Sequence, residues 1–129
     1  MNDGYIPMDS KQFARIKNAF EKNGGIIDSS PELDRHLDSR GSEAAAFSED
    51  TIIIKSGQIP SASAMFEELI HTTQYKSGKA TGSNWIQMEI EAKEKLVRYQ
   101  KQYRIPNIEN ERTLRQIEQL KKLSEKEGE

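Results

Sequence analysis

Two carboxylates and an imidazole stand close together in the segment Glu67-Glu68-Leu69-Ile70-His71. Because an α-helix turns through about 100° per residue, Glu67 and His71 would lie one turn apart on the same helical face. In a His-Glu-x-x-His helix, two ligands at this spacing bind Zn²⁺, and the glutamate after the first ligand acts as general base. By position, Glu67 and His71 are the expected metal ligands and Glu68 the expected catalytic base. The segment therefore predicts a site for a divalent metal, with zinc as the expected ion.

The glutamate at position 67 stands where the His-Glu-x-x-His pattern has its first histidine. A carboxylate oxygen binds zinc at about 2.0–2.2 Å, so the replacement is chemically admissible. It also adds negative charge, which should make the metal a poorer Lewis acid and would suit another divalent metal. A second interpretation needs no metal, because Glu67, Glu68 and His71 can simply face water or pair with Lys and Arg.

A catalytic zinc site needs three protein ligands and an open fourth position, so another donor is required. On a helical wheel of residues 85–103, Glu89 falls between two rows of apolar side chains. Glu91 shares its side of the wheel with charged residues that should be solvated. Burying a carboxylate is costly unless it is paired or bound to a metal. We therefore expect Glu89 to be the third metal ligand, with Glu91 as the alternative.

Apolar periodicity, together with capping and breaking residues, predicts the elements that must position these side chains. The candidate ligands fall on a helix at about residues 62–75, which begins after Pro60, and on a long helix at about 85–103. For the long helix, Asn84 and Gln87 resemble a capping box. The other predicted elements are a helix at 9–22, strands at 25–28 and 51–55, helices at 30–39 and 109–124, a mobile loop at 77–83 and a frayed end at 125–129.

Several other side chains are expected to have structural places only. Trp85, Tyr99 and Tyr103 lie on an apolar stripe and are expected in the core. Thr73 falls on the core-facing side of the helix at 62–75. His36 lies in a polar stretch, so we expect it at the surface and outside the metal site.

The composition restricts the possible functions. A chain of 129 residues suits one domain, with the core expected mainly between residues 10 and 105. The net charge of -2, with both signs interspersed, offers no basic surface for nucleic acid. The lack of cysteine excludes disulfides, thiolate metal sites and a cysteine nucleophile. No apolar stretch approaches the roughly 20 residues that span a bilayer, so we expect a soluble chain, either cytoplasmic or the exported module of a larger protein.

The order of several short motifs along the chain resembles a known family. These motifs are Gly24-Gly25-Ile26-Ile27, Gly41-Ser42-Glu43-Ala44, Thr51-Ile52-Ile53-Ile54, Glu67-Glu68-Leu69-Ile70-His71-Thr72-Thr73-Gln74, Glu89-Ile90-Glu91-Ala92 and Tyr103-Arg104-Ile105-Pro106. Together they resemble the zincin-like metallopeptidase toxin domains at the C-termini of bacterial polymorphic toxins. The resemblance covers about residues 10–120.

This resemblance implies a single zincin-like, gluzincin-like domain over residues 1–129. Its fold would be α+β and mostly helical, with a small sheet packed beside the active-site helix. It implies Glu67, His71 and Glu89 as metal ligands and Glu68 as the general base of a peptidase that acts on a protein or peptide. A cognate immunity protein is the partner implied for such a toxin.

Two functions remain as alternatives. The first is metal-dependent peptide hydrolysis, in which the strand at residues 51–55 would align an extended substrate by backbone pairing. The second is a catalytically degenerate zincin-like fold, whose long helices and Trp85 region would bind another protein. Neither alternative involves nucleic acid or a membrane.

Overall fold

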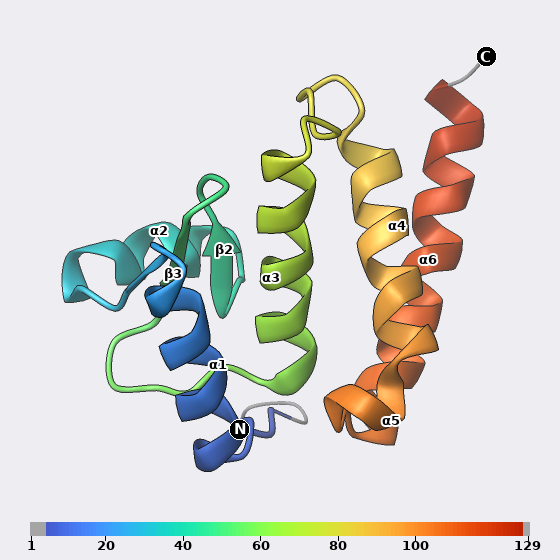
Figure 1. Cartoon of the computed structure of the whole chain (residues 1–129). Coiled ribbons are helices and arrows are strands. Elements are labelled where there is room, and N and C mark those ends of the chain that lie inside the picture. The colour runs from blue at the N-terminus through green and yellow to red at the C-terminus, as the bar shows by residue number, and fades with distance from the viewer. Residues whose placement is uncertain (1–4, 128–129) are drawn as a thin grey trace.

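A computed structural model of the chain describes residues 5–127 and has the expected α+β fold, mostly helical with a small sheet (Figure 1). Its helices are α1 (Ser10–Lys22), α2 (Asp34–Ser39), α3 (Ala62–Lys76), α4 (Trp85–Arg98), α5 (Gln100–Tyr103) and α6 (Asn107–Glu127), with a 3-10 turn at Pro31–Leu33. Its strands are β1 (Ile26–Asp28), β2 (Ala44–Ala46) and β3 (Thr51–Ile54). The elements predicted at 9–22, 25–28, 51–55 and 62–75 are confirmed to within one residue at each end, and the helix predicted at 30–39 is divided into the 3-10 turn and α2.

The sheet has the order β1-β3-β2, so β3 lies in the middle and β2 at an edge. β3 pairs in parallel with β1 and antiparallel with β2, and its isoleucines are buried. Both backbone edges of β3 are therefore occupied, so the prediction that this strand aligns a substrate by backbone pairing is wrong. The sequence does not predict β2, because its three alanines have low strand propensity and become a strand only by pairing with β3.

Helix α3 lies beside β2 and has α4 on its other side (Figure 1). It begins after Ser61, whose side chain accepts a hydrogen bond from the Ala64 backbone N–H. The chain leaves α3 through Gly78 at φ +78, a conformation that glycine adopts without strain. Met65 and Ile70 of α3 belong to the same buried cluster as residues of the sheet and of α4. This packing holds α3 between the sheet and α4.

The helix predicted over residues 85–103 is interrupted at Tyr99, where α4 gives way to the short helix α5. Tyr99 has φ -104 and ψ 23, outside the values of an α-helix. Asn84 does not form the predicted capping box. Its side chain instead accepts a hydrogen bond from the Thr81 backbone N–H and donates one to the Lys79 carbonyl. These bonds tie together the loop between α3 and α4, whose predicted mobility stays a prediction.

Helix α6 is longer than predicted, because it begins at Asn107 and continues through Glu127. Residues 125–127 are thus helical and not frayed, while residues 128 and 129 lie outside the described part of the chain. α6 also extends the core past residue 105, since Ile117 is 7% exposed and Glu109 only 1% exposed. Glu109 Oε1 accepts hydrogen bonds from the Ser63 backbone N–H at 3.1 Å and from its hydroxyl at 2.6 Å. α6 is thereby tied to the first turn of α3.

The aromatic residues of α4 and α5 do not all lie in the core as predicted. Trp85 is 50% exposed and Tyr99 is 38% exposed, because they stand at the two ends of α4, where neighbouring helices cover little of them. Tyr103 does pack inward, with its ring stacked on Phe66 at a centroid distance of 4.0 Å. Trp85 is therefore free to contribute to a binding surface.

Two smaller expectations are also corrected. His36 is partly buried and packs edge-on against Phe47, with ring centroids 5.6 Å apart, so it does not lie free at the surface. Thr73 is exposed, whereas its neighbours Thr72 and Gln74 are buried. The buried surface of α3 is thus split between the sheet side and the α4 side, a division that a single helical face does not capture.

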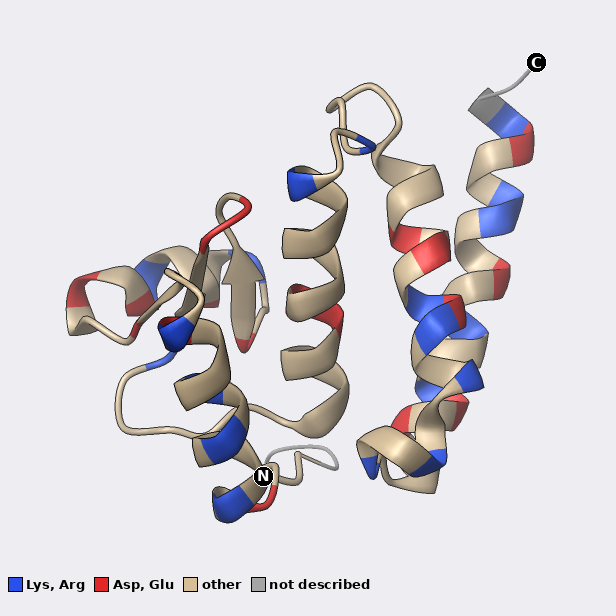
Figure 2. Ribbon diagram, in the orientation of Figure 1, with Lys and Arg blue, Asp and Glu red and all other residues tan. Residues whose placement is uncertain are grey.

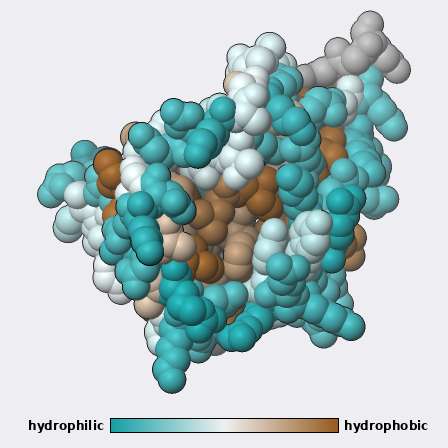
Figure 3. All heavy atoms as spheres, viewed as in Figure 1, coloured by the Kyte–Doolittle hydropathy of each residue, from teal (hydrophilic) through white to brown (hydrophobic). Residues whose placement is uncertain are grey.

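Charged residues are unevenly distributed over the molecule. Figure 2 shows few of them on α3 and many of both signs on α4 and α6. On the face viewed in Figure 3, apolar side chains appear at the bottom of a central hollow that hydrophilic residues surround. Within residues 5–127, no helix combines the length and apolar character needed to cross a membrane.

Candidate metal centre

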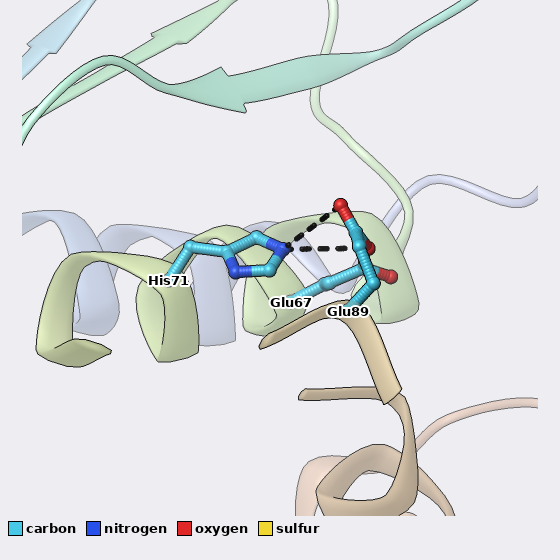
Figure 4. A group of neighbouring side chains, drawn as sticks. All are labelled: Glu67, His71 and Glu89. Atoms are coloured by element: carbon cyan, nitrogen blue, oxygen red, sulfur yellow. Dashed lines mark ion pairs between the residues drawn. The ribbon is translucent and has the colours of Figure 1, made fainter. Parts of the chain in front are cut away.

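Glu67 and His71 of α3 and Glu89 of α4 point toward one another where the two helices meet (Figure 4). His71 Nε2 lies 3.6 Å from Glu67 Oε2 and 3.6 Å from Glu89 Oε1. One donor atom from each of the three residues lies within 4.8 Å of the other two. The three residues could therefore hold a metal ion, and they are the same three that the sequence predicts as ligands.

The separations between the donor atoms suit a small divalent cation. With ligand bonds of about 2.0–2.2 Å and tetrahedral angles, two ligand atoms of one ion are about 3.4 Å apart. The two distances from His71 Nε2 are both 3.6 Å, close to that value, and the donor atoms of Glu67 and Glu89 lie within 4.8 Å of each other. The side chains of Glu67 and His71 are 16% and 15% exposed, and that of Glu89 is 32% exposed. A molecule from solution would therefore approach the centre from the Glu89 side.

Gln74 fixes the orientation of the His71 ring. Gln74 Nε2 donates to the Met88 carbonyl at 3.0 Å and to Glu91 Oε1 at 3.2 Å, and both of these atoms can only accept. The amide oxygen of Gln74 therefore faces His71 Nδ1, 2.7 Å away, and accepts the Nδ1 proton. Neutral His71 then has its lone pair on Nε2, the atom that faces the carboxylates. A metal-binding histidine usually has this arrangement.

Glu91, the alternative third ligand, is engaged elsewhere. Its carboxylate accepts from Gln74 Nε2 and lies 3.5 Å from Lys79 Nζ, and the Gln74 hydrogen bond lowers its pKa. The side chains of Glu89 and Glu91 are exposed to the same degree, 32% and 31%. Burial, on which the sequence-based choice depends, therefore does not separate them. Their partners do, because Glu89 faces His71 whereas Glu91 holds Gln74.

Glu68 lies beside the group of three without being part of it. Its Oε1 accepts a hydrogen bond from the Ala46 backbone N–H, 2.9 Å away on β2. Burial, and then the negative charge of Glu67, raises the pKa of Glu68 to about 8, although the His71 charge and the Ala46 N–H oppose the rise. A carboxyl group that titrates near neutral pH can accept and return a proton, as a general base must.

Glu67 and His71 are stabilised in opposite charge states. Burial alone would raise the pKa of Glu67, but its interaction with His71 and the charge of Lys93 outweigh burial and lower that pKa. Burial alone would lower the pKa of His71, but Glu67, Glu89 and Gln74 outweigh it and raise that pKa. Without a metal, a protonated His71 therefore pairs with both carboxylates. A metal ion would have to replace the Nε2 proton.

Lys93 is a fourth charged group of this centre, and the sequence-based prediction misses it. Its Nζ lies 2.9 Å from Glu67 Oε1 and 3.8 Å from Glu89 Oε2, and its side chain is only 12% exposed. Lys93 follows Glu89 by one turn of α4, so the i, i+4 spacing of opposite charges is a signal that could have found it. The sequence-based prediction also misses Gln74, for which the signal is weaker: its position three residues after His71.

A cleft of about 300 Å³ leads to the centre. Its walls include β2 on one side and Trp85 and Met88 of α4 on the other, and Glu67, Glu68, His71 and Glu89 all line it. The candidate ligands, the candidate base and the edge strand β2 thus face one space. That space can admit an extended ligand.

Comparison with protein-family models, with curated proteins and with solved structures finds no match to this chain. Chemical interpretation therefore depends on the geometry of Glu67, Glu68, His71, Glu89 and Lys93 and on the order of motifs in the sequence.

Proposed function

We propose that this protein is a metal-dependent peptidase of the zincin type, with zinc as its ion. The observation that carries the proposal is the convergence of Glu67, His71 and Glu89 from two helices, with His71 Nε2 3.6 Å from both carboxylates. The orientation of His71 by Gln74 fits this proposal, because the Nδ1 proton directed at Gln74 leaves Nε2 for an ion once that nitrogen has lost its proton.

Each residue of the centre has a role in this proposal. Glu67, His71 and Glu89 would hold the cation through one atom each. A bound divalent cation polarises the scissile carbonyl and makes a water molecule acidic enough to attack near neutral pH. Glu68 would accept the proton of that water and pass it to the leaving amine, a role that its raised pKa favours. The Ala46 N–H holds Glu68 Oε1, which leaves Oε2 for the proton.

The proposed substrate is a protein or peptide in extended form. β2 lines the cleft and is an edge strand of the sheet. Because its Ala46 N–H is bonded to Glu68, pairing with a substrate would use the other outward backbone groups of β2. The order of motifs along the sequence further supports a bacterial toxin domain, for which a cognate immunity protein would be the partner.

Zn²⁺ titration of chelator-treated protein, followed by calorimetry, tests the metal centre. We expect one ion per chain to bind at micromolar concentration or below, and Glu67→Ala and His71→Ala each to weaken binding at least about tenfold. Glu94→Ala is a matched control, because Glu94 is on the same helix as Glu89 but pairs with Lys121 at 3.4 Å. A wild-type protein that binds no Zn²⁺ at micromolar concentration would refute the proposal.

Catalysis is tested separately by incubating the zinc-loaded protein with a complex peptide mixture and identifying new termini by mass spectrometry. Glu68→Gln should abolish cleavage and keep zinc affinity, because Glu68 is not one of the three donors. Equal cleavage by wild type and Glu68→Gln would rule out Glu68 as the base.

A second candidate function is a non-catalytic interaction module, and Lys93 is the observation that favours it. Lys93 and the protonated His71 can balance Glu67 and Glu89 without any metal. In that case the exposed Trp85 beside the cleft would serve partner binding. Zn²⁺ should then change neither the melting temperature nor the spectra of the protein.

A further inference from the structure

Lys93 contacts the oxygen of each candidate carboxylate ligand that does not face His71. Its Nζ lies 2.9 Å from Glu67 Oε1, while Glu67 Oε2 faces His71 Nε2 at 3.6 Å. At Glu89 the division is the same, with Oε2 3.8 Å from Lys93 and Oε1 3.6 Å from His71. One oxygen of each carboxylate is thereby left to converge with the imidazole nitrogen.

The burial of Lys93 distinguishes this contact from an ordinary surface salt bridge. Its side chain is 12% exposed, less than that of Glu67 at 16% or Glu89 at 32%. An ammonium group is strongly hydrated, so burying it costs free energy unless it is paired. Lys93 also has no lone pair while protonated and cannot itself be a ligand. Its place beside both carboxylates is therefore best explained by what it does to them.

The charges of Glu67 and Lys93 show what that effect is. In the His-Glu-x-x-His pattern, the ligand at the position of Glu67 is a neutral imidazole. Glu67 carries one negative charge and Lys93 one positive charge, 2.9 Å apart, so the pair is neutral like the imidazole. The excess negative charge that would weaken the Lewis acidity of the ion is thereby offset.

We infer that Lys93 is a positioning residue that makes Glu67 equivalent to a neutral histidine ligand, by holding Glu67 Oε1 and cancelling its charge. This inference rests on the proposed metal function of Glu67, His71 and Glu89. It implies that the residues at positions 67 and 93 depend on each other. A glutamate at 67 is held and neutralised by the lysine, whereas a histidine at 67 would leave the lysine only its longer contact of 3.8 Å with Glu89, beside the cation.

Calorimetric titration with Zn²⁺ of four proteins tests this dependence: wild type, Lys93→Met, Glu67→His and the double variant Glu67→His/Lys93→Met. In the Glu67→His background, Lys93→Met should tighten zinc binding about tenfold or more, because the repulsive charge it removes outweighs the one remaining contact of Lys93, at 3.8 Å to Glu89 Oε2. In wild type it should change the dissociation constant less than about threefold, because the lost positioning of Glu67 offsets the lost repulsion. Lys93→Arg in wild type should keep the original affinity, since it keeps the charge.

Lys95→Met is the control for a general charge effect, because Lys95 is on the same helix but forms no ion pair with Glu67 or Glu89 among the described contacts. It should alter affinity by the same small factor in both backgrounds. Thermal unfolding in chelator verifies that each variant folds, and Lys93→Gln replaces the methionine variants if they do not.

An equal effect of Lys93→Met in the two backgrounds would overturn the inference and leave the metal centre standing. Absence of Zn²⁺ binding by all four proteins would overturn the metal centre and the inference together. The dependence would be established if the double variant bound zinc more tightly than Glu67→His, while Lys93→Met bound it about as tightly as wild type.

Discussion

Gln74→Leu is the substitution that most directly tests how the centre is oriented. Gln74 is 2% exposed and its amide oxygen accepts the His71 Nδ1 proton at 2.7 Å. Leucine fills a similar volume but accepts no hydrogen bond. His71 would then be free to place its proton on Nε2, which is the nitrogen that a metal must use. We therefore expect zinc binding to weaken although no ligand has been changed.

The structure sets the size of the effect. Loss of an outer hydrogen bond to a ligand histidine weakens metal binding by about 10–100-fold, or about 1.4–2.7 kcal/mol. The bonds of Gln74 to the Met88 carbonyl at 3.0 Å and to Glu91 at 3.2 Å are lost as well. Because His71 Nδ1 loses its partner in a side chain that is 15% exposed, unfolding should also become easier by about 1–3 kcal/mol.

Calorimetric Zn²⁺ titration measures the affinity, and ¹⁵N NMR of the His71 ring in the zinc-bound protein reports which nitrogen carries the proton. Gln12→Leu is the matched control, because Gln12 is also buried, at 7% exposure, and donates to the Tyr103 carbonyl far from the centre. It should lower stability without changing zinc affinity. Zinc affinity of Gln74→Leu within about threefold of wild type, with Nδ1 still protonated in the zinc-bound variant, would show that Gln74 does not orient the ligand.

Three further predictions follow from other contacts. Burial alone would lower the pKa of His71, but Glu67, Glu89 and Gln74 outweigh it and raise that pKa to about 11. Zn²⁺ must therefore displace a proton, and it should bind about tenfold more weakly for each unit that the pH falls below the raised pKa. Calorimetry in buffers of different ionisation enthalpy should show about one proton released per ion, and identical heats in all buffers would contradict this. Glu67→Gln should lower the pKa of Glu68 from about 8, because the Glu67 charge is its second cause after burial; ¹³C NMR of the Glu68 carboxyl measures the change. Glu109→Ala should reduce the free energy of unfolding by about 2–3 kcal/mol in urea denaturation, because a carboxylate that is 1% exposed and accepts two hydrogen bonds from Ser63 is lost. Unchanged stability of that variant would show that α6 is not anchored there.

The helix that carries Glu67, Glu68 and His71 follows from the sequence alone. Pro60 and Ser61 determine where it begins, and helical periodicity determines the one-turn spacing of Glu67 and His71. These are local properties that hold whatever packs against the helix. For the same reason the isoleucine run of β3 was sufficient to predict a strand.

Other elements depend on contacts that lie far apart in the chain. The alanines of β2 form a strand only because β3 offers them a backbone to pair with. Trp85 has the apolar periodicity of a core residue, yet nothing covers half of its surface. Periodicity states which residues share a face, but not whether another element reaches the end of that face.

In the candidate centre, too, one part follows from the sequence and another from tertiary packing. Its α3 half, Glu67 and His71, is set by one turn of helix and was predictable from spacing. Its α4 half is set by how α3 and α4 pack, which places Glu89 opposite His71, turns Glu91 toward Gln74, and brings Lys93 to Glu67 across 26 positions of sequence. Burial favoured Glu89 over Glu91 in the sequence, but both are about a third exposed, at 32% and 31%, and only the helix packing separates them. The sequence by itself determined which helix presents the chemistry, and the tertiary structure decided which charges meet there, because helical geometry relates residues within a turn whereas packing relates one helix to another.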